Sequence, residues 1–235
     1  MKQCLWILLI APLLLGCQQK SKPQPARSAT PTPLAAHVTG ETITTEALNK
    51  VYGHIDGQPV LRQVLIRLRK GKVKMQDIPY TFAIDEVPMD ADLVGNLTLR
   101  DVTFDGLPDL LIYQGAYGNQ GAGHYDCYVQ DAKSRQFVHA PTYAAISNPD
   151  ASTQDKAIYS AERASAAVYV YKKYTFSGTA FVLSDSLVEQ FGAAPKPRYS
   201  LWQRQSHRLL PALSATDGAR LPTEWRSRVQ TAGNQ

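Results

Sequence analysis

Residues 101–113 read DVTFDGLPDLLIY, an oxygen-rich turn followed directly by an apolar strand. In the first nine residues, oxygen-bearing side chains stand at positions 1, 3, 5 and 9, and a glycine follows the third of them. Ca²⁺ takes about six to eight oxygen ligands, and the EF-hand loop supplies them at alternate positions with glycine at position 6. The pattern predicts a Ca²⁺ site with these ligands: the side chains of Asp101, Thr103, Asp105 and Asp109, and the carbonyl of Leu107.

The same stretch departs from the EF-hand in one respect. Position 12 of an EF-hand loop is a bidentate glutamate, whereas here it is Ile112. The loop is therefore not an EF-hand. An ordinary Asp-Gly turn between two strands would also account for Asp105 and Gly106, and this alternative stays open at the level of sequence.

Outward from this stretch, short runs of β-forming residues alternate with turn signals. Asp56-Gly57 and Lys70-Gly71-Lys72 are typical of tight turns between paired strands. A helical pattern is confined to Thr44–Asn49 and parts of the C-terminal region, and no repeat of fixed period is present. We predict an all-β fold: a single antiparallel β domain, built as a barrel, a sandwich or a propeller-like sheet, with short helical segments. Strands are expected near residues 51–55, 60–69, 73–75, 80–84, 93–99, 110–113, 125–130, 135–139, 167–175 and 179–183.

The N-terminus indicates an export signal. Residues 1–16 have a basic start and a short apolar core, which are typical of a cleaved signal and not of a membrane-spanning helix. Leu14-Leu15-Gly16-Cys17 resembles the bacterial lipobox, in which the cysteine is lipidated and becomes the new N-terminus. This resemblance predicts a periplasmic protein anchored through Cys17, and Gln18 favours the inner leaflet of the outer membrane. The composition of residues 17–36 predicts a disordered tether.

Charge divides the chain into three parts. Residues 1–36 carry a net charge of +4, residues 37–195 a net charge of −4, and residues 196–235 a net charge of +5. We assign residues 37–195 to the β domain. Residues 196–235 form a basic segment with Trp202 and Trp225, expected as a disordered tail or an added contact segment. Such a segment can contact anionic lipid, nucleic acid or an acidic partner, but nucleic acid is not expected behind a lipoprotein signal.

A second unusual stretch, GAYGNQGAGHYD at residues 115–126, follows the apolar strand by one residue. It lacks Gly-Lys-Ser/Thr and a following helix pattern, which excludes the common phosphate-binding loops. Its glycines predict a long, protruding hairpin loop that displays aromatic and polar side chains. The loop would be either a protein interface or a connection without a partner. The candidate partner-binding residues are Tyr117, Asn119, Gln120, His124 and Tyr125.

The sequence offers little support for catalysis. Its five histidines form no His-x-x-x-His or His-Glu-x-x-His motif, and no serine lies in Gly-x-Ser-x-Gly. Cys127 falls in an expected strand, where a buried structural thiol is the usual role, and it has no disulfide partner in the mature chain. Asp85-Glu86 and Asp90 with Asp92 match a glycosidase pair only in residue type, and we interpret them as solvated loop charge. We therefore expect a protein that is not an enzyme.

Several of these features follow one another in an order known from one family. They are Asp101–Leu110, the glycines of residues 115–123, Tyr125-Asp126-Cys127-Tyr128, Asp131, Phe137 and Asn148-Pro149. In this respect residues 100–160 resemble a family of periplasmic lipoproteins. The family includes immunity proteins against lysozyme-like effectors of type IV secretion systems, and its fold is similar to that of periplasmic inhibitors of invertebrate-type lysozyme. The resemblance implies an antiparallel β fold, a Ca²⁺ site and a loop that enters a muramidase cleft. The Ser-Gly-x-x-Tyr loop of the lysozyme inhibitors is absent, since Gly121-Ala122-Gly123-His124-Tyr125 occupies that place.

The residues and the resemblance together predict a periplasmic immunity protein that binds and blocks a secreted, lysozyme-like peptidoglycan hydrolase. Two alternatives stay open. One is a Ca²⁺-stabilised cell-envelope binding module for glycan or envelope protein, without an inhibitory role. The other is a muramidase-type hydrolase. An immunity protein would bind a hydrolase one to one, a binding module would bind peptidoglycan itself, and an enzyme would turn it over.

Overall fold

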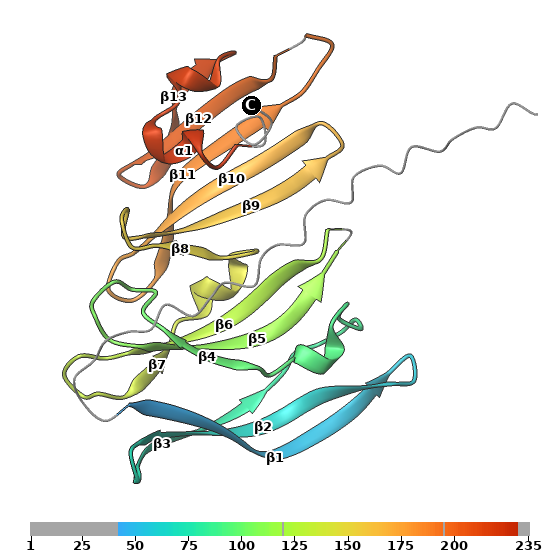
Figure 1. Ribbon diagram of the computed structural model, residues 1–235, viewed down its shortest axis with the longest axis vertical. Coiled ribbons are helices and arrows are strands. Elements are labelled where there is room, and N and C mark those ends of the chain that lie inside the picture. The colour runs from blue at the N-terminus through green and yellow to red at the C-terminus, as the bar shows by residue number, and fades with distance from the viewer. Residues whose placement is uncertain (1–41, 119, 195, 230–235) are drawn as a thin grey trace, which may run out of the picture. The chain divides into compact units, whose positions relative to one another are not determined.

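The computed structural model describes residues 42–118, 120–194 and 196–229. These residues confirm the predicted antiparallel all-β class, because their strands form three antiparallel sheets (Figure 1). Within each sheet, strands that follow one another in sequence are neighbours in space, and among the described residues no sheet closes into a barrel. No helix in this part of the chain is long and apolar enough to cross a membrane. The predicted signal, the tether and Cys17 lie outside the described residues.

The elements have the following bounds. The first sheet contains β1 (Ile43–Ile55), β2 (Gln58–Lys70) and β3 (Val73–Thr81). The second contains β4 (Leu97–Arg100), β5 (Asp109–Tyr117), β6 (Ala122–Gln130) and β7 (Phe137–His139). The third contains β8 (Asp150–Ser152), β9 (Ala157–Ser165), β10 (Val168–Phe176), β11 (Phe181–Gln190), β12 (Arg198–Gln205) and β13 (Arg208–Ala215). Short helical segments are 3₁₀ turns at Ala91–Leu93, Pro141–Ala145 and Gly218–Arg220, and the helix α1 (Thr223–Arg226).

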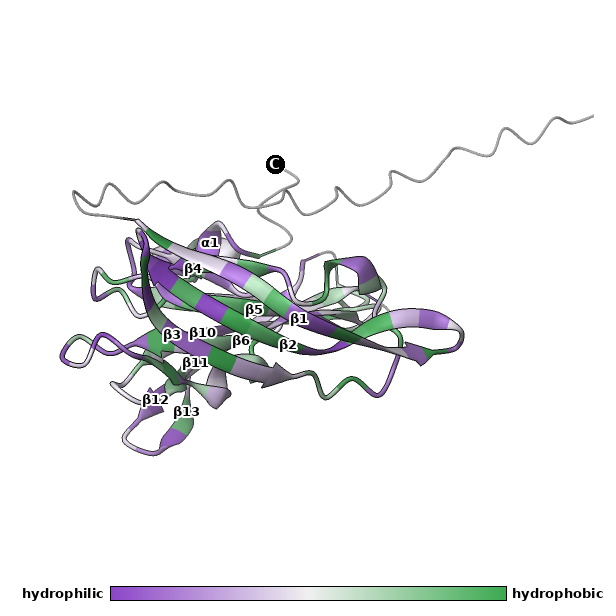
Figure 2. Ribbon diagram, turned by 90° about the horizontal axis from the view of Figure 1, so that it is seen from below, coloured by the Kyte–Doolittle hydropathy of each residue, from purple (hydrophilic) through white to green (hydrophobic). Residues whose placement is uncertain are grey.

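Strand β2 shows why the first sheet packs on one face. Successive side chains of a strand point to opposite faces, and the hydropathy along β2 alternates accordingly (Figure 2). Ile66 and Leu68 are buried in a core that also contains Leu110 and Ile112 of β5. The first and second sheets therefore pack face to face through this core.

The second sheet is buried on both faces. Leu111 lies between Leu110 and Ile112 but points the other way, into a second core with Ile158 and Phe181 of the third sheet. A strand that is buried on both faces needs apolar residues at successive positions. This requirement explains the unbroken run Leu110–Ile112 in the sequence.

The C-terminal residues cover the remaining face of the third sheet. Tyr159 of β9 and Leu187 of β11 pack there against Leu221, Trp225 and Val229. The indole of Trp225 is fully buried and meets the ring of Tyr159 edge-on at a centroid distance of 5.4 Å. Residues 196–229, set apart in the sequence by their charge, thus extend the third sheet through β12 and β13 and then close its core.

The helical pattern of Thr44–Asn49 was misleading. These residues belong to β1, which pairs with β2 in antiparallel register, for example Ala47 with Ile66. Glu46, Ala47 and Leu48 favour a helix intrinsically, but pairing and burial in a sheet outweigh such propensities. Asn49 adopts a φ of 50° at a register shift, so the strand contains a bulge at this point.

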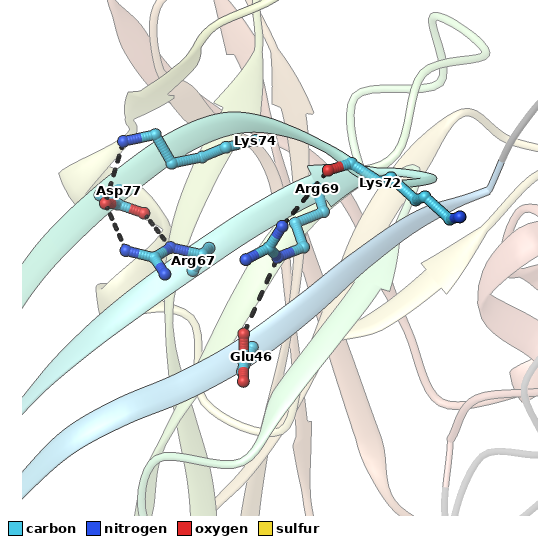
Figure 3. A network of polar contacts seen from close by, with 6 residues as sticks. All are labelled: Glu46, Arg67, Arg69, Lys72, Lys74 and Asp77. Atoms are coloured by element: carbon cyan, nitrogen blue, oxygen red, sulfur yellow. Dashed lines mark hydrogen bonds and ion pairs between the residues drawn. The ribbon is translucent and has the colours of Figure 1, made fainter.

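The outer face of the first sheet is charged and internally paired (Figure 3). Arg67 donates to both carboxylate oxygens of Asp77, at 2.8 and 2.9 Å, and Lys74 lies 3.4 Å from the same carboxylate. The hydrogen bond from Arg67 is the main cause that lowers the pKa of Asp77 to about 2. Glu46 and Arg69 are 3.9 Å apart. This face of the sheet therefore carries a set of solvent-exposed ion pairs between neighbouring strands.

Candidate functional site

The predicted Ca²⁺ loop is organised around the side chain of Asp109. This carboxylate is fully buried, and its Oδ2 accepts hydrogen bonds from the amides of Val102 and Thr103 at 2.9 and 3.1 Å. Its Oδ1 accepts from the amide of Gln130 in β6 at 3.0 Å. Burial raises the pKa of Asp109 to about 6, although these amides act against the rise. Asp109 therefore ties the loop to the second sheet.

Asp101 folds the loop back on itself. Its Oδ1 accepts from the amide of Phe104 at 2.6 Å, and its Oδ2 accepts from the amide of Gly106 at 2.9 Å. Phe104 and Gly106 both have positive φ, at 63° and 87°. Asp105 is exposed and accepts only from the amide of Leu107, at 2.8 Å. The backbone thus makes the sharp turn that the glycine predicted.

Three of the five predicted ligands lie close together. Thr103 Oγ1 is 3.5 Å from Asp101 Oδ1 and 3.3 Å from Asp109 Oδ2. All predicted donors are oxygens, which suits a hard cation such as Ca²⁺. Among the residues that the structure describes, however, no three His, Cys, Asp or Glu side chains form a group placed to hold a metal. The Ca²⁺ site stays a prediction.

The glycine-rich stretch is shorter as a loop than expected. Strand β5 continues to Tyr117 and β6 begins at Ala122, so only residues 118–121 connect them. Gly118 and Gly121 have positive φ, which a tight connection between paired strands requires. The strand pairing places His124 opposite Gly115. Most of the stretch is therefore rigid hairpin and not free loop.

Four of the five candidate partner-binding residues are described, and three of them form ring contacts at the end of this hairpin. The rings of Tyr117 and His124 lie 6.1 Å apart, and those of Tyr113 and Tyr125 lie 5.0 Å apart. Gln120 is exposed in the connection, and Asn119 lies outside the described residues. Burial, followed by the charge of Asp90, raises the pKa of the half-buried Tyr117.

Residues 88–96 brace one side of the hairpin, and sequence reasoning missed this role. Asp90 accepts a hydrogen bond from the Ala116 amide at 2.8 Å and another from the Tyr113 hydroxyl. The Met89 amide donates to the Ala116 carbonyl at 3.0 Å. Asp90 looked like solvated loop charge, and only the tertiary contact reveals its function as an anchor.

Asn148 braces the hairpin at a second point. The side-chain Oδ1 of Asn148 accepts a hydrogen bond from the backbone amide of Gly123 at 2.8 Å. The backbone amide of Asn148 donates to the Gly123 carbonyl at 2.9 Å. With Asp90 on one strand and Asn148 on the other, both strands of the hairpin end are fixed from outside. A binding surface that is ordered in advance loses less conformational entropy when a partner docks.

A polar cluster joins the first and second sheets and was also missed. The buried Asp126 accepts from the Tyr80 hydroxyl at 2.8 Å and lies 2.8 Å from His139 Nε2. The ring of His139 packs at 4.9 Å from that of Tyr128. A carboxylate that is buried in a strand needs hydrogen-bond partners, but the sequence of β6 alone does not show that Asp126 is buried or that its partners lie on β3 and β7. The cluster bridges β3, β6 and β7.

Comparison with known proteins bears on the fold. No protein-family model and no curated protein matches the sequence. Among solved structures, the chain is similar to a Xanthomonas type IV secretion system related protein, with a TM-score of 0.53 and 18% identity over 73% of this chain and 88% of that chain. A Bacteroides fragilis protein of unknown function aligns over 76% of this chain and 94% of its own, with 10% identity and a TM-score of only 0.28. At these identities, the first likeness concerns the fold alone.

Proposed function

We propose that the chain is a periplasmic, lipid-anchored immunity protein that blocks a lysozyme-like peptidoglycan hydrolase and has no catalytic activity of its own. The observation that carries the proposal is the braced end of the β5–β6 hairpin. It combines Tyr117 and His124 with Gly118 and Gln120, which are exposed in the connection between the strands. Aromatic side chains on a rigid support are typical anchors of protein interfaces.

The likeness in fold supports the same function. A solved protein related to a type IV secretion system shares the architecture, and residues 100–160 resemble immunity proteins against effectors of such systems. The two observations come from different comparisons, one of coordinates and one of sequence order. The likeness in fold favours a role connected with a type IV secretion system, and the resemblance in sequence order adds a secreted effector as the partner.

The proposed mechanism is steric. The hairpin end enters the glycan-binding cleft of the hydrolase, so that peptidoglycan cannot occupy it. The bracing contacts of Asp90 and Asn148 keep the hairpin in its binding conformation. Ca²⁺ at residues 101–109 would rigidify the start of β5, the strand from which the hairpin projects.

Inhibition of peptidoglycan lysis tests the proposal. The purified protein is mixed with the hydrolase encoded beside its own gene, and lysis is followed by turbidity. We expect one-to-one inhibition by the wild type and loss of inhibition when Tyr117, His124 and Tyr125 are changed to Ala. Gln120→Arg, an exposed substitution that leaves the packing intact, should weaken inhibition as well.

The control variant carries Tyr169→Ala and His207→Ala on the third sheet. It removes the same kinds of side chain far from the hairpin in sequence and should inhibit like the wild type. Tyr125 and Tyr169 both pack against a core, so every variant must be shown to stay folded at the assay temperature, by thermal unfolding, before a loss of inhibition is assigned to the hairpin. If the wild type neither inhibits nor binds the hydrolase but binds purified peptidoglycan, the protein is an envelope binding module instead.

A further inference from the structure

A groove of about 500 Å³ lies next to the braced hairpin. One wall comes from the end of the β1–β2 hairpin, with Tyr52, Pro59 and Leu61. The other wall comes from residues 88–96, with Met89 and Val94. The proposed mechanism uses residues 88–96 only as a brace and leaves this groove without a function.

The walls of the groove expose large apolar side chains. Met89 is 70% exposed and Tyr52 is 55% exposed. Scattered apolar residues are common on protein surfaces, whereas apolar residues that line a hollow together mark an interaction site. Met89 and Tyr52 belong to segments about 40 residues apart in sequence, so the fold brings them to one groove.

The groove is continuous with the end of the β5–β6 hairpin. A Cβ atom added at Gly121 would lie 3.3 Å from Met89 Sδ, and one added at Gly115 would lie 2.6 Å from Pro88 Cβ. The Gly95 amide donates to the Tyr113 carbonyl at 2.8 Å. One surface therefore extends from the hairpin connection across Met89 to Tyr52.

This surface is acidic near its centre. Residues 85–92 read DEVPMDAD, with four carboxylates and no basic residue, and Lys50 is the one basic residue among those that line the groove. Burial is the main cause that raises the pKa of the Tyr117 hydroxyl; the charges of Asp90, Glu86 and Asp85 raise it further, and the charge of Arg62 acts against them. Peptidoglycan is anionic, so an enzyme that binds it presents a cationic surface around its cleft. An acidic surface with apolar walls complements such a rim.

We propose that the groove is the second half of the partner-binding surface and receives an apolar side chain that projects from the cationic rim of the hydrolase cleft. This inference rests on the proposed function, because it takes the hydrolase as the partner. The hairpin end occupies the cleft, and the groove holds the rim beside it. The groove side chains control the lifetime of the complex, and the carboxylates control its rate of formation.

Binding kinetics of the full-length chain with the purified hydrolase test the inference. The groove variant combines Tyr52→Ala with Met89→Ala. Its complex with the hydrolase should dissociate at least about tenfold faster than that of the wild type. The two substitutions remove an aromatic and a thioether side chain that the partner would bury. The control variant combines Val73→Ala with Val138→Ala, which are 68% and 56% exposed outside the groove. It should dissociate like the wild type.

A charge variant examines the second part of the inference. Glu86→Gln with Asp92→Asn should slow association by about fivefold at low ionic strength, and the difference should vanish at high salt. Tyr52→Arg places a cation opposite the cationic rim and should weaken binding more than Tyr52→Ala. All these positions are exposed, so the variants should unfold at the temperature of the wild type.

The outcomes separate the two proposals. If the groove variant binds like its control while the Tyr117, His124 and Tyr125 variant loses binding, the groove inference is wrong and the immunity function holds. If the wild type does not bind the hydrolase, both proposals are wrong. If the groove variant alone weakens binding, the groove is the main site and the hairpin is accessory.

Discussion

The two ends of strand β5 carry the two stretches that are most unusual in the sequence, and they are built in opposite ways. Before the strand, residues 101–109 turn their carboxylates inward onto backbone amides, and Asp109 is fully buried. At the other end, Asp90 holds Ala116 and Asn148 holds Gly123 from outside the hairpin, and Gln120 is exposed between the strands. The stretch at the start of β5 therefore stabilises the fold, whereas the stretch at its other end holds side chains at the surface.

The largest expected effect comes from Asp109→Ala at the inward-facing end. The change leaves the buried amides of Val102, Thr103 and Gln130 without an acceptor. We expect the free energy of unfolding to fall by about 3 kcal/mol or more, measured by urea titration. Asp105→Ala is the matched control within the loop and should cost less than about 1 kcal/mol, because Asp105 is exposed and accepts a single hydrogen bond. Equal losses would show that the loop is not organised around Asp109.

Addition of Ca²⁺ separates the roles of Asp109 and Asp105 further. If residues 101–109 bind Ca²⁺, saturation at about 100 times the Kd stabilises the fold by about 2.7 kcal/mol. Differential scanning fluorimetry with Ca²⁺ or EDTA should show a rise in melting temperature for the wild type. Asp105→Ala should remove the rise while leaving the melting temperature in EDTA almost unchanged. An identical melting temperature in both buffers would make the loop a turn that needs no cation.

At the outward-facing end, Gly115→Ala should have an intermediate effect. Gly115 has a φ of 122°, and a Cβ atom there would meet Pro88 at 2.6 Å. We expect a loss of about 2 kcal/mol in unfolding free energy, together with weaker hydrolase inhibition as residues 88–96 move. Gly118→Ala is the control, because its φ of 73° is also positive but no atom lies within 4 Å. It should cost only about 1 kcal/mol.

The smallest effect is expected at the Arg67–Asp77 ion pair, which serves neither end of β5. The pKa of Asp77 is lowered to about 2 in the fold, below the value of about 3.9 for an unperturbed aspartate. Its contribution is therefore present above pH 4 and is lost as the pH falls towards 2. Asp77→Asn should lower the melting temperature slightly at pH 6 and by a clearly smaller amount at pH 2, where about half of the Asp77 carboxyl groups are protonated in the fold. A difference of the same size at both pH values would mean that the pair acts through packing and not through charge.

The sequence allowed much of the fold to be predicted because the signals were local. The turn at Asp56-Gly57 has positive φ at both residues, as two-residue hairpins require. The alternation in β2 and the apolar run in β5 follow directly from burial of one or both faces. Thr44–Asn49 was mistaken for a helix because its intrinsic preference conflicts with its pairing.

The remaining features depend on contacts between distant residues. Asp90, Asp126 and Asn148 look like solvated polar residues in the sequence, and only the fold brings them to Ala116, Tyr80 and Gly123. Trp225 lies among prolines and basic residues that suggest an unpacked tail, yet its indole fills a core. The groove beside Met89 has no local signal at all, because its two walls come from separate segments.

The position of Trp225 has a consequence for how the chain reaches its native state. Leu221, Trp225 and Val229 complete the core of the third sheet, and they follow the end of β11 by about 30 residues or more. A polypeptide emerges from the ribosome, or from a translocation channel, with its N-terminus first. The apolar face of β9 and β11 therefore stays exposed to water until residues 221–229 have emerged as well. During this interval the uncovered face is a surface at which the unfinished chain can aggregate.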